Sequence, residues 1–194
     1  MAAVAAGPVI RVREARREDL ERIQAIYAHH VRHGLASFEE TPPDLEEIVR
    51  RFEATLAAGL PYLAAELEAA GSAAGVQGYA FAGRYRPRPA YRYTVENSVY
   101  VAPDGVGCGV GRALLGELIR RCTALGYRQM VAVIGDSDNV ASIRLHEAFG
   151  FAHAGTLRSV GFKFGRWVDS VIMQRPLGEG DTAPPGAPPA GTTG

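Results

Sequence analysis

The stretch TVENSVYVAPDGVGCGVGRALL, residues 94–115, changes character twice along its length and decides the fold. Its first part, residues 94–101, alternates in the way of a half-buried strand. One face carries Val95, Val99 and Val101, and the other carries Glu96, Ser98 and Tyr100. Pro103 stops the strand, glycines follow, and an apolar-faced helix begins near residue 110. The stretch therefore predicts a strand, a glycine-rich turn and a helix.

The turn holds four glycines at alternate positions, namely Gly105, Gly107, Gly109 and Gly111. Glycines at such a junction let backbone N–H groups converge where a helix N-terminus favours an anion. Phosphate binding is therefore one interpretation, and close packing is the other. No Gly-Lys-Ser/Thr follows, so this is not a P-loop, and no acidic residue ends a following strand as in a dinucleotide fingerprint.

Length and composition exclude several classes of protein. A chain of 194 residues suggests one domain, and a formal net charge of zero offers no field for nucleic acid or an anionic membrane. No apolar run reaches the roughly 18 residues that a membrane span needs, and the start lacks the positive flank of a signal peptide. Cys108 and Cys122 lie at no metal-ligand spacing, which predicts a reduced, cytoplasmic protein without a metal site.

Hydrophobic periodicity predicts the order β-α-α-β-β-β-α-β-α-β-β. The predicted strands cover residues 9–14, 62–67, 75–83, 94–101, 129–134, 151–157 and 167–175, with helices over 18–31, 44–59 and 139–149 and after the glycines. Residues 1–8 are predicted to be a flexible N-terminus and 9–177 a single domain. From residue 178 the chain is rich in Pro and Gly, which predicts a disordered tail. His29, His30 and His33 are interpreted as a solvated helix end, with a metal role as the alternative.

The sequence of strand, Val-Tyr-Val, turn, Gly-x-Gly and amphipathic helix resembles the acetyl-CoA-binding core of the GNAT superfamily of N-acetyltransferases. The resemblance implies an α/β (α+β) fold with a central mixed, mostly antiparallel, splayed sheet flanked by helices. Val106 is a departure, because Gln or Arg is usual there. The residues implied to bind acetyl-CoA are Val99, Tyr100, Val101, Val106, Gly107, Cys108, Gly109, Val110, Gly111, Arg112, Asn139 and Ser142.

Four segments resemble a narrower branch, the phosphinothricin and methionine-sulfoximine N-acetyltransferases. They are SFEETPP (37–43), RPAYRYTVENSVYV (88–101), VAVIGDSDNVASIRLHEAFGF (131–151) and VGFKFGRWVD (160–169). The resemblance implies transfer of an acetyl group to the amine of a small amino-acid-like substrate, and, by analogy, a homodimer. Two alternatives remain. One is an acetyltransferase for another amine, such as a polyamine or a protein N-terminus, and the other is a non-catalytic CoA-binding sensor.

Two residues are candidates for proton transfer. Glu96 interrupts a β-prone run, and the branch places its proposed base there; a buried carboxylate would be a better base. The alternative is a surface Glu, or one paired with a nearby arginine. His146 stands where many GNAT enzymes carry a Tyr that protonates the leaving thiolate, and His titrates near neutral pH. The alternative is a histidine hydrogen-bonded within the core.

The segment RYRPRPAYRY, residues 84–93, alternates arginines with tyrosines. Arginine forks suit carboxylates, but taken alone the segment reads as a solvated loop with arginines stacked on tyrosines. The resemblance implies that Arg86 and Arg88 bind the substrate, that Phe38 closes over it, and that Tyr91 assists. The basic character of this loop argues against a polyamine substrate.

Overall fold

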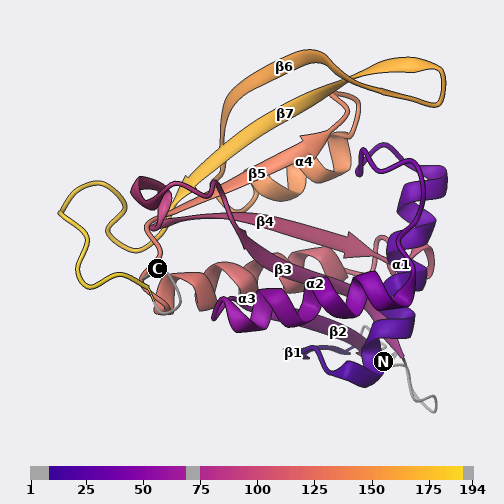
Figure 1. Cartoon of the computed structure of the whole chain (residues 1–194), viewed down its shortest axis with the longest axis horizontal. Helices are drawn as coiled ribbons and strands as arrows, with labels where there is room; N and C mark the ends of the chain where they lie inside the picture. The colour runs from indigo at the N-terminus through magenta and orange to yellow at the C-terminus, as the bar shows by residue number, and fades with distance from the viewer. Residues whose placement is uncertain (1–8, 69–74, 190–194) are drawn as a thin grey trace, which may run out of the picture.

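A seven-stranded sheet, in the order β1-β2-β3-β4-β5-β7-β6, runs through the computed structural model, which describes residues 9–68 and 75–189. Every neighbouring pair is antiparallel except β4 and β5, which are parallel. The strands are β1 (Val9–Glu14), β2 (Tyr62–Glu68), β3 (Val76–Arg84), β4 (Thr94–Val101), β5 (Gln129–Gly135), β6 (Ala152–Lys163) and β7 (Arg166–Pro176). The helices are α1 (Leu20–His33), α2 (Leu45–Ala57), α3 (Val110–Ala124) and α4 (Val140–Glu147). The mixed, mostly antiparallel sheet flanked by helices is confirmed (Figure 1).

The sheet opens at its parallel pair. β4 and β5 are in register only over 94–97 and 129–132, although each strand continues for several residues beyond. Past Asn97 the two strands therefore diverge and leave their facing backbone groups without ladder partners. The splay that the resemblance implied is present, and it lies in the stretch that decides the fold.

Helices cover both faces of the sheet, α1 and α2 on one face and α3 on the other (Figure 1). The core on the α3 face contains Val95, with Val99 and Val101 packed against it. The core on the α1–α2 face contains Tyr79, and Tyr100 packs against it. The alternation read from residues 94–101 is thus confirmed. It separates Glu96, on the α1–α2 face, from the valines that support α3.

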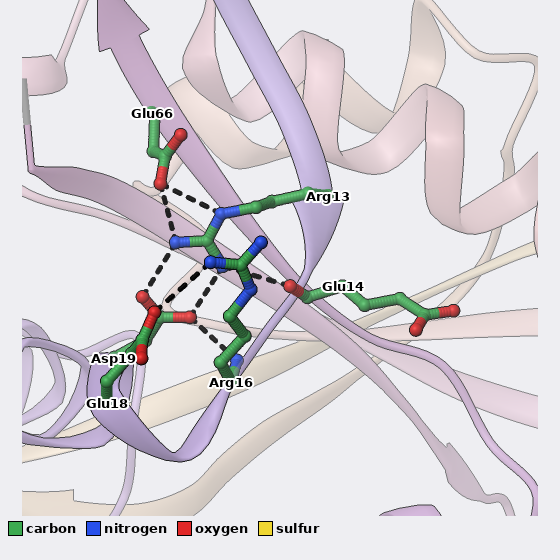
Figure 2. Close-up of polar contacts among 6 residues, drawn as sticks. All are labelled: Arg13, Glu14, Arg16, Glu18, Asp19 and Glu66. Carbon is green, nitrogen blue, oxygen red and sulfur yellow. Dashed lines mark hydrogen bonds and ion pairs between the residues drawn. The ribbon is translucent and has the colours of Figure 1, made fainter.

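Charged residues fix the entrance of α1 against the sheet edge (Figure 2). The Arg13 guanidinium on β1 donates to both carboxylate oxygens of Asp19, at 2.7 and 2.8 Å, and to Glu66 on β2 at 2.8 Å. Burial alone would raise the pKa of Asp19, but the bonds from Arg13 and from the Arg16 backbone lower it below its ordinary value. Removing Arg13 would leave a buried carboxylate without its ion-pair partner, so this cluster fixes the start of α1 to β1 and β2.

Helix ends follow the residues that the sequence offers. Asp44 precedes α2 and accepts a bond from the Glu47 backbone N–H at 2.8 Å. Gly34 ends α1, and its N–H bonds to the carbonyl of His30 at 3.0 Å. In the described ranges, no helix combines the length and apolar character needed to cross a membrane.

Two segments differ from expectation. β6 extends to Lys163, well past its predicted end at residue 157, because residues 158–163 continue one long hairpin with β7, whose bounds differ from the prediction by one residue at each end. The tail was predicted to be disordered from residue 178, yet Arg128 donates to the carbonyls of Gly180 and Ala183, each at 2.8 Å. The partly buried guanidinium of Arg128 thus makes contacts with the tail that its Pro/Gly composition does not predict. The expected turn at 70–74, the N-terminus 1–8 and residues 190–194 lie outside the described residues.

Candidate active site

Three adjoining cavities follow the divergence of β4 and β5. The glycine cavity, beside residues 105–112, has a volume of about 450 Å³. The fork cavity, between the strands, has about 50 Å³, and the Glu96 cavity, on the α1–α2 face, has about 400 Å³. Ala36 and Tyr100 line all three. The opening in the sheet therefore lies between a glycine-rich site and a site that contains a carboxylate.

The glycine cavity has the features of an anion cradle. Gly107 and Gly109 have φ angles of +80° and +88°, a region that favours glycine. Gly109 caps α3 without any side-chain cap bond, so the first N–H groups of the helix have no intrahelical acceptor. A Cβ on Gly111 would lie 3.4 Å from Leu145 and Val101 side-chain atoms, so the wall there is already close-packed. The donor set and the helix dipole suit a pyrophosphate.

All but one of the residues predicted to bind acetyl-CoA line this cavity. They are Val99, Tyr100, Val101, Val106, Gly107, Gly109, Val110, Gly111, Arg112, Asn139 and Ser142. Val106 is 68 % exposed, so its side chain is not required by the core. Cys108 does not line the cavity; its side chain packs against the core beside α3.

His30 also lines the glycine cavity, which the sequence analysis missed. Its Nε2 lies 2.8 Å from the carbonyl oxygen of Val101, and its ring lies 5.4 Å from that of Tyr100. Burial lowers its pKa below the ordinary value, opposed by the bond to Val101. The interpretation of His30 as part of a solvated helix end is wrong. Its spacing of four from Ile26 and three from Tyr27 places it on the apolar stripe, and that signal could have identified it.

The Glu96 cavity brings together residues that are distant in sequence. Phe38 and Glu39 come from the connection between α1 and α2, Glu96 and Ser98 from β4, and Ser170 from β7. Burial raises the pKa of Glu96 above its ordinary value, and the charge of Arg86 opposes that rise. Glu39 is paired with Arg51 at 2.7 Å, whereas Glu96 forms no ion pair with any described residue. Glu96 is therefore the carboxylate in this cavity best suited to accept a proton.

The predicted substrate arginines lie apart from the cavity lining. Arg86 lies over the ring of Tyr85, 4.4 Å from its centroid, and its charge acts on Glu96. Arg88 precedes the short 3-10 turn Pro89–Tyr91, and Tyr91 packs edge-on to Tyr85. None of Arg86, Arg88 and Tyr91 lines the Glu96 cavity, while Phe38 does.

His146 reaches the fork cavity from α4 and is 4 % exposed. Its Nδ1 lies 2.8 Å from the carbonyl oxygen of Ser142, which can only accept, so Nδ1 carries a proton. Its Nε2 lies 3.0 Å from Oδ1 of Asn97, whose Nδ2 donates to the Val131 carbonyl at 3.1 Å. These bonds suit a doubly protonated ring, whereas burial lowers the pKa of His146. The hydrogen bonds of the His146 ring can hold a second proton, and the lowered pKa makes that proton easy to release.

Asn97 is the second residue that the sequence analysis missed. It is 6 % exposed and stands at the last register position before β4 and β5 diverge. Its amide connects β5 to α4 through Val131 and His146. Within the described part of the chain, no three His, Cys, Asp or Glu side chains are grouped as a metal site.

Comparison with known proteins agrees with this geometry. Residues 12–172 match the family model described as "Acetyltransferase (GNAT) domain". The chain is 58 % identical over 174 residues to phosphinothricin N-acetyltransferase of Alcaligenes faecalis, covering 90 % of this chain and 86 % of that protein. It is 44 % identical over 173 residues to the L-methionine sulfoximine/L-methionine sulfone acetyltransferase of Pseudomonas aeruginosa, covering 89 % and 98 %.

A solved structure shows the same arrangement. It is the GNAT superfamily phosphinothricin acetyltransferase from Sinorhizobium meliloti in complex with AcCoA, with a TM-score of 0.88 and 45 % identity. The match covers 95 % of this chain and 97 % of that one. With the splayed sheet, the glycine cradle and these relatives together, the chain belongs to the GNAT family of acetyltransferases.

Proposed function

We propose that this protein transfers the acetyl group of acetyl-CoA to the primary amine of a small amino-acid-like substrate. The observation that carries the proposal is the position of Glu96. This carboxylate has a raised pKa in one cavity, and the small fork cavity connects that cavity's lining to the glycine cradle. An amine bound beside Glu96 would therefore meet a thioester that enters from the other side of the sheet.

Glu96 serves as the general base in this proposal. An amine is protonated near neutral pH and must lose a proton before it can attack. The raised pKa brings the carboxylate closer to the working pH, which improves the transfer of that proton. Glu96 has no ion-pair partner among the described residues, and the charge of Arg86 only partly offsets the rise in its pKa that burial causes.

Acetyl-CoA, the activated acetyl donor, fits the glycine cavity. The N-terminus of α3 and the backbone around Gly107 and Gly109 would hold the pyrophosphate. Past Asn97 the β4 backbone over 99–101 has no β5 partner and would hold the extended arm of the donor and stabilise charge on the thioester oxygen, with the Val101 carbonyl already bonded to His30. His146, at the fork, would return a proton to the leaving thiol.

The substrate class rests on the relatives and on one charge. The named relatives act on phosphinothricin or on methionine sulfoximine and sulfone, which are amino acids with a tetrahedral side-chain group. The charge of Arg86 acts on Glu96, and Arg86 would bind the substrate carboxylate together with Arg88, two residues further along the chain. A polyamine would instead need a surplus of free carboxylates, and Glu39 is already paired with Arg51.

A panel of amines tests the proposal. Purified protein is mixed with acetyl-CoA and one of phosphinothricin, methionine sulfoximine, spermidine or a peptide with a free N-terminus, and thiol release is followed. We expect release with the two amino acids and its loss in Glu96→Gln. If thiol is released only with spermidine or only with the peptide, the proposed substrate class is wrong and that amine takes its place. Tight acetyl-CoA binding without any release would favour a sensor.

We also propose that the protein forms a homodimer in the cytoplasm. β6 ends the sheet order, and the part of the hairpin beyond β5 exposes large apolar side chains. They are Leu157, Val160, Phe162, Phe164 and Trp167, with exposed fractions between 53 and 64 %. Such a patch beside an edge strand fits a second copy of the chain. Light scattering should report a dimer for the native protein and a monomer for Trp167→Glu.

Both cysteines are free, which agrees with the reducing conditions of the cytoplasm.

A further inference from the structure

Lysine occurs once in this chain, at position 163, and the other 20 of its 21 Lys and Arg residues are arginines. The one lysine is not at the surface: it is 2 % exposed, at the end of β6. Charged side chains are almost never buried to this extent without partners. The burial of Lys163 therefore has to be explained by its contacts inside the protein.

The partners of Lys163 are two backbone carbonyls. Nζ donates to Ser37 at 2.7 Å and to Gly34 at 3.0 Å. Both carbonyls belong to the substrate segment, residues 34–44, which connects α1 to α2 and carries Phe38. Burial lowers the pKa of Lys163 below its ordinary value, and the more distant charges of Glu39 and Glu40 oppose this. An ammonium is compact and its three donors rotate, so it can meet two carbonyls where a planar guanidinium is too large.

The same strand provides space for the Phe38 ring. Gly161 lies two residues before Lys163, on the same face of β6. A Cβ on Gly161 would lie 2.5 Å from the ring, and one on Gly135 would lie 3.1 Å from it. The ring therefore lies directly on backbone of β6 and β5, beside the Glu96 cavity that it lines.

We propose that Lys163 is a positioning residue for the amine subsite. It fixes the backbone on both sides of Leu35 and Ala36, so that the substrate segment holds Phe38 against Gly161 and closes the Glu96 cavity. Lys163 itself lines neither the Glu96 cavity nor the glycine cavity; it bonds to Ser37, which lines the Glu96 cavity, and it acts through Phe38. The inference rests on the proposed function for the nature of the ligand, an amino-acid amine.

Kinetics of Lys163→Met test this role. The substitution keeps the length of the side chain and removes the donors, so we expect the amine KM to rise about tenfold or more, the effect of losing a charged hydrogen bond. The acetyl-CoA KM should stay within about twofold, because the cradle is on the other face. Arg158→Gln, an exposed position on the same strand, is the matched control and should change neither constant.

A double-mutant cycle shows whether Lys163 acts through Phe38. If it does, Lys163→Met should add nothing to the amine kcat/KM already lost in Phe38→Ala. Additive losses would overturn the proposal. Gly161→Ala is a second route that removes no charge: its Cβ displaces the ring, and it should raise the amine KM without changing that for acetyl-CoA.

Chemical labelling tests the anchor without relying on turnover. Because the chain has one lysine, an amine-reactive reagent reports Lys163 directly by mass spectrometry of its peptide. We expect slow labelling compared with the N-terminal amine, and slower labelling still when phosphinothricin saturates the site. Rapid labelling without the amine would overturn the anchor. An inactive protein whose lysine is slow to label would instead contradict the proposed function alone.

Discussion

Replacement of Glu96 by Gln separates a base from a structural carboxylate. Gln keeps the size of the side chain and part of its hydrogen bonding but cannot accept a proton. General-base catalysis contributes about 10²–10⁴ to a rate, so kcat/KM at pH 7 should fall by that factor, or about 3–5 kcal/mol in the barrier. Acetyl-CoA affinity, measured by calorimetry, should not change, because the Glu96 side chain faces α1–α2 and not the cradle.

The same substitution should not lower thermal stability, and at pH 7 it should raise it. The folded-state pKa of Glu96 is above the ordinary value because burial disfavours its charge. A group of this kind destabilises the fold at pH values above its folded pKa, and the cost disappears as pH falls below the ordinary pKa. The Tm of Glu96→Gln should thus exceed that of the native protein at pH 7, with the gap closing near pH 4.

The pH–rate profile completes the test. In the native protein kcat/KM should fall as pH drops through the raised pKa of Glu96, since the carboxyl then holds its proton. That acid limb should be absent from Glu96→Gln, and the deficit should shrink at high pH because the amine deprotonates unaided. A folded variant with nearly full activity at pH 7, or one with a lower Tm and a loss independent of pH, would refute the reasoning.

Three further predictions concern the rest of the site. Arg86→Ala should raise the amine KM about tenfold or more and move the acid limb to higher pH, since Arg86 lowers the pKa of Glu96; Arg88→Ala should leave the limb in place. Gly111→Val should raise the acetyl-CoA KM or abolish binding with the amine KM retained, because its γ-carbons must enter the cavity; unchanged affinity by calorimetry would exclude the cradle. His146→Asn should lower kcat by about 10²–10⁴ with little change in either KM, whereas a fall in Tm alone would show a purely structural histidine.

Local physics explains why much of the fold could be predicted from the sequence. The alternation over 94–101 predicts that Val95 and Glu96 lie on opposite faces of the strand, which is confirmed: Val95 packs in the core on the α3 face and Glu96 lines the cavity on the other face. The glycines before α3 were predicted to form a turn that leads into a helix, and Gly107 and Gly109 do so with φ values of +80° and +88°, a region that favours glycine. Each of these features depends on residues that are close to one another in the sequence.

The features that could not be predicted depend on partners far along the chain. The spacing in α1 places His30 on the buried face, but its partner Val101 is 71 residues away, and nothing local to α1 identifies β4 as its neighbour. The anchor of Lys163 spans 126 residues to Ser37. Arg128 meets the tail across 52 residues, so composition alone described that segment poorly. Cys108 illustrates a finer limit: a motif places its backbone at the cradle, whereas packing turns its side chain to the core.

The site depends on where the sheet stops pairing. Four residues of β4 pair with β5, and the four that follow have no β5 partner. Asn97 stands at this boundary and donates to the Val131 carbonyl, so its amide supplies the next bond where backbone pairing ends. Its Oδ1 holds His146 at the same point, which couples the width of the fork to the orientation of the proposed proton donor. The buried Asn97 amide thus lies where the strands diverge, and it positions His146 there, while Glu96 precedes it directly in the chain.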